Sequence, residues 1–371
     1  MDATRLKDSF ARIAMYGDEV PLFFYSDLFI KHPEVRDMFP ISMRAQRDHL
    51  VGALAQIVSQ VDDLVSLTAF LQGLGRDHRK FGTIADHYAA VGGSLLATFA
   101  HFAGEGWTPE LAADWAAAYD LVAQVMIEAA SQDEGVRPPF WTGTVLACER
   151  RSYDICVLHV RPEPRLDYLP GQSVAIESPR RPRLWRYYSM ANAPRPDGTV
   201  EFHVRMVDGG AVSMALVYEV PVGEEIRIGP PVGVLTLDTT SGRDILMVAG
   251  STGLAPLKAL IEQIAGLPRP PHVHLFFGAR TSDELYDLPS LDKMAGEYPW
   301  LSVVPAVAAD RRFAGEVGNL ADVVARRGNW SGHDAYLAGP TELVRRTAEL
   351  LTAAGMPRNQ IHLEDFGWSE S

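Results

Sequence analysis

The chain of 371 residues contains only two cysteines, carries no excess of positive charge and has no long apolar run. Because Cys148 and Cys156 are too few for a disulfide framework or a Cys-rich metal site, we expect both to be buried, unreactive thiols. A formal net charge of −13 disfavours nonspecific binding to nucleic acid or to an anionic membrane, because both depend on excess lysine and arginine. No apolar stretch approaches the roughly 20 residues that span a bilayer, and the first residues have no secretory pattern, so we expect a cytoplasmic protein without membrane insertion.

What the sequence does contain is a succession of regions with different periodicities. In the first third of the chain, apolar residues recur every three or four positions, as in amphipathic helices. The clearest case begins at Thr108, a typical N-cap followed by Pro109, and continues through Leu111 and Trp115. This region predicts an all-α domain, which we place at residues 1–133.

A break in the helical period separates this region from two others. Acidic residues, a glycine and paired prolines interrupt the pattern between Ser131 and Trp141, as in a linker. Short alternating runs follow at the spacing of an antiparallel β-barrel, which we place at residues 134–240. Beyond it, buried-strand runs alternate with helical patterns, which predicts a parallel sheet with helices on both faces over residues 241–371. The fold class is therefore a multidomain combination of α, β and α/β parts.

One segment of the predicted barrel, RLWRYYSMANAP, has an R-x-Y-S order in Arg186, Tyr188 and Ser189. Standing alone, it would favour a strand with a paired arginine and core tyrosines. It resembles, however, the flavin-binding signature of ferredoxin-reductase-like flavoproteins, in which the arginine neutralises the FAD pyrophosphate and the tyrosine packs on the isoalloxazine ring. Two more segments match in the family's order, PGQSVAI upstream and DGGAVSMAL downstream, where free N–H groups at a helix start suit a pyrophosphate. The FAD-binding residues that this resemblance implies are Gln172, Arg186, Tyr187, Tyr188, Ser189, Gly210, Val212 and Ser213.

The third region contains a strand, a glycine-rich turn and a helix in VAGSTGLAPLKAL, without the G-x-G-x-x-G fingerprint. Further on, YLAGP and the terminal LEDFG resemble two more landmarks of the same reductases, the loop beside the nicotinamide and the residues that cover the flavin. Ala338 stands where many relatives have cysteine, which predicts slower hydride transfer. The remaining nucleotide- and flavin-binding residues that the resemblance implies are Gly250, Thr252, Gly253, Pro256, Gly339, Pro340, Glu364 and Phe366.

The stretch GLGRDHRKFG places one histidine, His78, among charges on what reads as a short helix. A histidine in such surroundings is usually a solvated surface residue, and we expect this of His32, His49 and His87. A reductase, however, delivers electrons to an acceptor, and a helical domain is an acceptor only when it holds a redox group such as haem.

The other parts of a haem pocket follow in globin order. Tyr25 stands at the distal tyrosine position, and Phe39 at the phenylalanine that wedges the haem. His78 stands where globins place the proximal iron ligand. The order Tyr, Phe, Gln, Leu, His, Tyr, fused to this reductase, resembles the flavohaemoglobins. The resemblance implies haem b with His78 as the iron ligand, Phe39 at the haem, and Tyr25, Gln46, Leu50 and Tyr88 as catalytic residues.

One position in the last globin helix departs from the family pattern. Flavohaemoglobins usually have a glutamate there that joins the proximal histidine and tyrosine and makes the imidazole more electron-donating. The corresponding residue is Ala130. Glu128 lies about 200° around a helix from that position, and Glu134 lies beyond the expected helix end. The resemblance therefore predicts a weaker push on the iron and a lower dioxygenase rate.

The resemblance covers essentially the whole chain and implies a nitric oxide dioxygenase with haem, FAD and NADH or NADPH. Nitric oxide and dioxygen would be its substrates, and no protein partner would be required to deliver electrons. Because Ala130 and Ala338 depart from the pattern, two alternatives stay open. One is a variant that acts as a haem reductase or oxidase, or with another electron donor. The other is a globin-based sensor of oxygen or nitric oxide.

Overall fold

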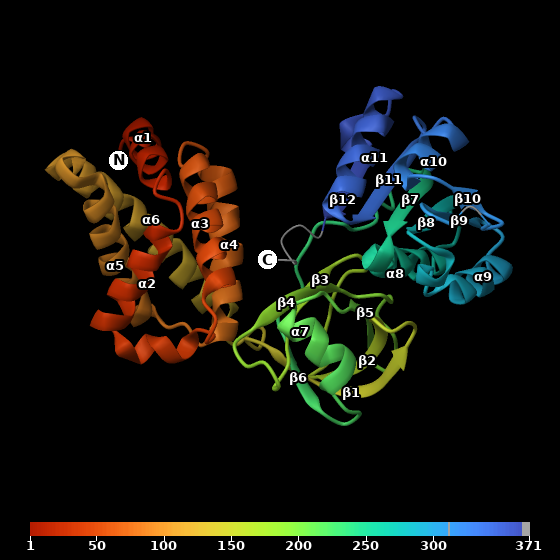
Figure 1. Cartoon of the computed structure of the whole chain (residues 1–371), viewed down its shortest axis with the longest axis horizontal. Helices are drawn as coiled ribbons and strands as arrows, with labels where there is room; N and C mark the ends of the chain where they lie inside the picture. Colours follow the sequence, from red (N-terminus) through yellow and green to blue (C-terminus); the bar gives the residue numbers. More distant parts are fainter. Residues whose placement is uncertain (311, 366–371) are drawn as a thin grey trace. The chain divides into compact units, whose positions relative to one another are not determined.

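The computed structural model describes residues 1–310 and 312–365. It divides into two compact units, Met1–Phe140 and Trp141–Ser371 (Figure 1). The predicted combination of a helical domain, an antiparallel sheet and a parallel sheet is confirmed, while the domain limits at residues 133 and 240 remain predictions. Among the described residues, no helix has both the length and the apolar character needed to cross a membrane.

The first unit consists of helices that bury their apolar stripes against one another. The predicted N-cap is present, because the Thr108 hydroxyl oxygen accepts a hydrogen bond from the N–H of Leu111 at 3.3 Å. Two of the helices cross at Gly75, where a Cβ atom would lie 2.3 Å from the carbonyl oxygen of Met126, so that only glycine permits this approach. The helices are α1 (Ala3–Ala14), α2 (Glu19–Lys31), α3 (Arg44–Ser59), α4 (Leu64–His78), α5 (Ala85–Ala103) and α6 (Pro109–Asp133), with 3₁₀ turns η1 (Pro33–Met38), η2 (Arg79–Phe81) and η3 (Gly104–Gly106).

The second unit begins with an antiparallel sheet. Its strands are β1 (Trp141–Arg150), β2 (Ile155–Glu163), β3 (Ser173–Glu177), β4 (Trp185–Ser189), β5 (Val200–Arg205) and β6 (Glu225–Ile228). They lie in the order β4-β3-β6-β1-β2-β5. A bridge between Met190, just after β4, and Phe202 of β5 links the two end strands, as closure into a barrel requires. The helix predicted after the glycine pair is short: α7 (Ala211–Met214) continues as a π-helical turn, η4 (Ala215–Glu219).

The two cysteines form a disulfide, so the prediction of free thiols is wrong. Cys148 lies on β1 and Cys156 on β2, the two arms of one hairpin, with their Cα atoms 6.0 Å apart. The cysteine count excluded a framework of several bridges. It did not exclude a single bond between neighbouring strands, which needs only two residues placed across a hairpin.

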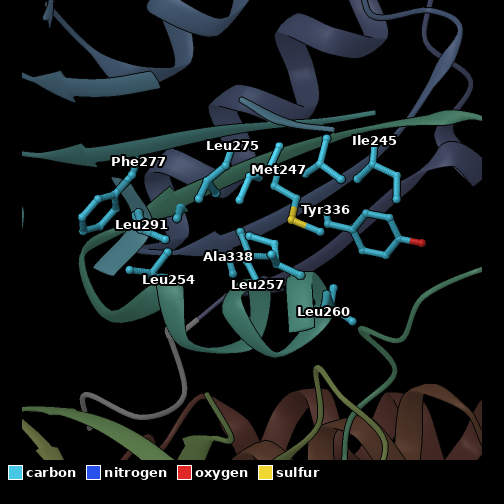
Figure 2. Packing of buried hydrophobic residues seen from close by; sticks show 14 of the residues in the cluster. Ile245, Met247, Leu254, Leu257, Leu260, Leu275, Phe277, Leu291, Tyr336 and Ala338 are labelled. Carbon is cyan, nitrogen blue, oxygen red and sulfur yellow. The ribbon is translucent and has the colours of Figure 1, made fainter. Parts of the chain in front are cut away.

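The second unit ends with a parallel sheet in the order β10-β9-β8-β7-β11-β12. Successive residues of its central strands point to opposite faces. Met247 and Leu275 pack under α8 and α9, whereas Leu246 and Phe276 pack against α10 and α11, and Figure 2 shows the first of these two cores. Helices on both faces are thereby confirmed. The elements are β7 (Asp244–Gly250), η5 (Ser251–Gly253), α8 (Leu254–Ala265), β8 (Val273–Ala279), η6 (Ser282–Glu284), α9 (Leu288–Glu297), β9 (Leu301–Val307), β10 (Glu316–Val317), α10 (Leu320–Arg327), β11 (His333–Gly339), α11 (Thr341–Ala353), η7 (Arg358–Gln360) and β12 (Ile361–Asp365).

Between the barrel and the parallel sheet lies a group of buried charges. Glu201 and His203 alternate along β5 with barrel-core residues, so their side chains leave the barrel on its outer side. There the Nζ atom of Lys258, on α8, lies 2.9 Å from Glu201 Oε1 and 3.0 Å from Asp287 Oδ2. The side chains of these three ionic residues are at most 8% exposed. We call Glu201, His203, Lys258, Tyr286 and Asp287 the polar joint.

The side chain of His203 in the polar joint is neutral. His203 Nε2 lies 3.0 Å from Glu201 Oε1, and its Nδ1 lies 2.7 Å from the Tyr286 hydroxyl. Burial lowers the pKa of His203. Burial by itself would raise the pKa of Glu201, but the hydrogen bond from His203 and the charge of Lys258 outweigh it and hold that pKa below its usual value. Nε2–H therefore donates to the carboxylate, and the Tyr286 hydroxyl donates to Nδ1.

Replacing Lys258 by methionine is expected to lower the free energy of unfolding of the second unit by about 3 kcal/mol, because two buried carboxylates lose their common cation. Urea unfolding followed by tryptophan fluorescence measures the change. Lys293→Met is the matched control. Its ammonium is exposed and 3.9 Å from Glu297, so the effect is expected to stay within about 0.5 kcal/mol. Equal effects of the two substitutions would contradict a stabilising role for the polar joint.

Candidate functional sites

His78 is the last residue of α4, a helix of 15 residues and not the short helix that the charged stretch suggested. Its Nδ1 lies 2.8 Å from the carbonyl oxygen of Leu74, one turn earlier in the helix. A carbonyl can only accept, so Nδ1 must carry a proton. Burial lowers the pKa of His78 and favours the neutral imidazole. In the neutral ring the Nε2 lone pair is then available to a metal, as in proximal histidine ligands.

The predicted distal residues come together from α2, α3 and the segment between them. The hydroxyl of Tyr25 donates to the main-chain carbonyl oxygen of Gln46 at 3.3 Å. Its ring contacts those of Phe29 and Phe39, with centroids 5.7 and 5.5 Å away. Burial raises the pKa of Tyr25, so the hydroxyl stays protonated and remains a donor at neutral pH. Leu50 packs on the same apolar cluster.

The apolar residues of this unit form two clusters. Tyr25, Phe39 and Leu50 belong to or pack against the larger one, whereas Leu74 and Tyr88 pack against a smaller one built from α4 and α6. The predicted distal residues therefore lie with one cluster, and the helix turn that ends at the predicted ligand lies with the other. The chemistry of the side chains suits a haem, because His78 offers an unprotonated Nε2, Phe39 an apolar ring and Tyr25 a buried hydroxyl donor.

Near His78, the predicted iron ligand, neither glutamate of this part of α6 takes the position that Ala130 leaves. Glu128 accepts a hydrogen bond from Gln132 at the surface, and Glu134 is exposed at the helix end. The buried carboxylate is Asp133, whose Oδ2 accepts a hydrogen bond of 2.5 Å from Arg79. Sequence reasoning missed this pair. The available signal was an arginine directly after the candidate ligand and an aspartate in the last turn of α6.

The predicted flavin residues lie on β4 and on the final strand of the parallel sheet. Tyr188 packs against the barrel core, and burial raises its pKa, whereas Tyr187 is exposed on the other side of the strand. The Ser189 hydroxyl lies 3.4 Å from Glu364 Oε2, so the structure brings these two residues together. Arg186 donates to the neighbouring carbonyl of β4 at 2.9 Å. These side chains supply the cation, the aromatic rings and the hydroxyl expected of a flavin site.

The glycine pair before α7 forms a tight turn that its own residues hold. A Cβ atom on Gly210 would lie 2.6 Å from the Ser213 hydroxyl, which itself donates to the Gly210 carbonyl and accepts the N–H of Val207. Val212 is buried in the barrel core. The amide oxygen of Gln172 accepts a main-chain N–H at 2.9 Å in the loop before β3. The hydroxyl of Ser213 thus fixes the turn.

The glycines predicted to bind the nucleotide lie at the carboxyl edge of the parallel sheet. The first strand in sequence, β7, lies beside β11, and between these strands the chain order reverses, where α/β proteins bind ligands. A Cβ atom on Gly253 would lie 2.2 Å from the carbonyl oxygen of Ala338, and one on Gly339 would lie 2.9 Å from that of Gly250. Only glycines allow the two strand ends to meet so closely.

The turn after β7 is tied to the barrel by residues that sequence reasoning did not find. Ser251 is a non-glycine residue with a φ of 52°, and its hydroxyl accepts a hydrogen bond of 2.9 Å from Arg205 at the end of β5. Arg205 is itself held by Asp154 at 2.9 Å. Thr252 lies in this turn and Pro256 in the buried first turn of α8. The signal was the alternation of charged residues along β5.

The remaining predicted positions divide between the sheet edge and the chain end. Ala338 is fully buried in the core under α8, and Pro340 directly precedes α11 at the carboxyl end of β11. Phe366 lies outside the described residues. The roles of the individual site residues stay predictions.

Comparisons with known proteins agree with this division. The globin family matches residues 22–126, the oxidoreductase FAD-binding domain residues 146–237, and the oxidoreductase NAD-binding domain residues 247–349. A flavohemoprotein of Bordetella pertussis is 28% identical over 95% of this chain and 94% of its own length. The chain belongs to the flavohaemoglobin family. Haem, FAD and a nicotinamide nucleotide are therefore its cofactors.

Two further proteins resemble the reductase part and the whole of this flavohaemoglobin, respectively. A ferredoxin–NAD(P)⁺ reductase component of the naphthalene dioxygenase and salicylate hydroxylase systems of a Ralstonia species is 33% identical, over 66% of this chain and 75% of that protein. The solved structure of a flavohemoglobin from Malassezia yamatoensis, with bound FAD and haem, aligns with a TM-score of 0.79 at 19% identity. The alignment covers 98% of this chain and 99% of the solved chain, so the two proteins share a fold.

Replacing His78 by alanine is expected to remove the iron ligand, and the purified flavohaemoglobin should then lose its haem while it keeps its FAD. The ratio of Soret absorbance to flavin absorbance measures this loss. His49→Ala serves as the control, because His49 is exposed on α3 and its loss should leave the ratio unchanged. A His78→Ala protein with the wild-type ratio and ferrous spectrum would refute the ligand assignment.

Proposed function

We propose that this flavohaemoglobin is a nitric oxide dioxygenase that oxidises nitric oxide to nitrate with dioxygen and NAD(P)H. The observation that carries the proposal is the pairing of His78, whose Nε2 is available for iron, with the buried hydroxyl donor of Tyr25 in the same helical unit. The FAD- and NAD-binding domains in the same chain supply electrons without a separate reductase.

When bound, haem supplies an iron that takes up dioxygen, and FAD divides the electron pair of the nicotinamide into single electrons. Tyr25 presents a hydroxyl whose bond to the Gln46 carbonyl, at 3.3 Å, is long for an O–H···O contact. Such a donor exchanges its acceptor for a stronger one at little cost. The surrounding rings hold the phenol in place and exclude water, which strengthens any hydrogen bond that the hydroxyl makes.

In this proposal, residues of the reductase unit shape the turn at the sheet edge and hold the last strand beside β4. Gly250 and Gly253 let the ends of β7 and β11 pack closely at the sheet edge, and the Arg205 guanidinium donates to the hydroxyl of the intervening Ser251, whose φ is positive. Ser189 and Glu364 hold the last strand of the sheet against β4. Each NAD(P)H gives two electrons, and oxidation of one nitric oxide to nitrate by dioxygen consumes one, so one nucleotide serves two turnovers.

A specific observation favours a second candidate, a haem reductase or oxidase that does not use nitric oxide. Leu74 supplies only a neutral carbonyl to His78, and the buried carboxylate of Asp133 is engaged with arginines instead of the imidazole. A histidine with a neutral partner donates less charge to iron than one with a carboxylate partner, which disfavours oxygen chemistry that needs an electron-rich iron.

A nitrate assay separates the two candidates. With NADH, air and nitric oxide, the proposal predicts nitrate in equal amount to the nitric oxide consumed. NADH consumption that nitric oxide does not affect, without nitrate, would support the haem reductase instead.

Replacement of Tyr25 by phenylalanine should speed dioxygen dissociation by about three- to tenfold, which corresponds to the loss of one hydrogen bond. Stopped-flow displacement of dioxygen by carbon monoxide measures this rate.

A further inference from the structure

The residue after the iron ligand is tied to the end of α6. The guanidinium of Arg79 donates to both the side chain and the main-chain carbonyl of Asp133, and to the carbonyl of Arg137 at 3.0 Å. The other carboxylate oxygen of Asp133 accepts two hydrogen bonds from Arg137, at 3.0 and 2.7 Å. The side chains of Asp133 and Arg79 are 4% and 11% exposed, whereas that of Arg137 is 46% exposed.

These contacts act at the end of two helices that are already fixed at their crossing. Gly75 of α4 touches the main chain of Met126 of α6, so the helices cannot slide at that point without a clash. Arg79 lies about one turn beyond Gly75, and Asp133 about two turns beyond Met126. The ion pair therefore joins the C-terminal ends of α4 and α6 beyond their crossing and holds the turn that carries His78.

The way Asp133 is connected to His78 through the main chain of Arg79 supports a role for this carboxylate in positioning the imidazole and not in donating charge to it. His78 is the last residue of α4, and Arg79 begins the 3₁₀ turn η2, so a shift of the Arg79 main chain moves the imidazole directly. Asp133 reaches Arg79, and the Nδ1–H of His78 is used by Leu74. The carboxylate therefore orients the ligand without touching it.

We propose that Arg79, held by Asp133, is the positioning residue for the proximal iron ligand of this flavohaemoglobin. It fixes the turn that carries the imidazole, in a chain that has Ala130 on α6 where the resemblance implies a glutamate. The inference rests on haem binding by His78 and is independent of whether nitric oxide is the substrate.

Two substitutions of the same kind on the same carboxylate test the proposal. In Arg79→Met, Asp133 keeps both hydrogen bonds from Arg137, so the buried charge stays paired and the unit is expected to fold. Arg137→Met removes those two bonds but leaves Arg79 in place. Resonance Raman spectra of the ferrous full-length protein give the iron–histidine stretching band, and transfer to excess apomyoglobin gives the rate of haem loss.

The expected result is a broader iron–histidine band at lower frequency and about tenfold faster haem loss in Arg79→Met, with wild-type values in Arg137→Met. Arg79→Lys should recover part of the effect, since it keeps one cation near Asp133. A purely structural role would lower the thermal stability of both methionine variants and leave the band unchanged, which would overturn the proposal. Absence of an iron–histidine band in the wild-type protein would instead refute His78 as the ligand.

Discussion

The hydrogen bond from His78 Nδ1 to the carbonyl oxygen of Leu74 determines which nitrogen the helical unit presents to a metal. Because the acceptor is a main-chain carbonyl of the same helix, the tautomer is set by α-helical geometry and does not depend on another side chain. Burial then keeps the ring neutral. In the proposed haem site, the hydroxyl of Tyr25, the rings around it and the ion pair at Arg79 contribute only once this nitrogen is in place.

The reductase unit depends on a different constraint, the burial of charge between its two sheets. Removal of Lys258 and of the carboxylates of Glu201 and Asp287 from water costs free energy. The ion pairs that Lys258 makes with both carboxylates offset this cost. The contact joins β5 of the barrel to α8 and to the loop before α9 of the parallel-sheet part. It also lies on the same strand as Arg205, which holds the turn at the nucleotide edge. The ion pairs of Glu201 and the hydrogen bond from Arg205 to Ser251 therefore start from the same strand, β5.

Local patterns predicted the architecture well because each rests on short-range physics. The Thr108 cap, the helical stripes and the buried-strand run of β7 follow from local sequence patterns, and the order of landmarks identified the family. Features that depend on contacts between distant segments escaped the sequence. The Cys148–Cys156 bond needs the hairpin register, and the pairing of Arg79 with Asp133 needs the crossing angle of α4 and α6. The hydrogen bonds by which the Ser213 hydroxyl fixes its own turn also could not be read from the sequence.

The central claim is that one chain carries electrons from a nicotinamide nucleotide through flavin to a haem on His78. Anaerobic addition of NADH to the full-length protein, followed by stopped-flow absorbance, tests it most directly. The account predicts that the flavin band bleaches first and that the Soret band then shifts to its ferrous position. The rate of that shift should not depend on protein concentration, because the electrons move within one chain. A flavin that is reduced while the haem stays ferric, or a spectrum without a Soret band, would contradict it.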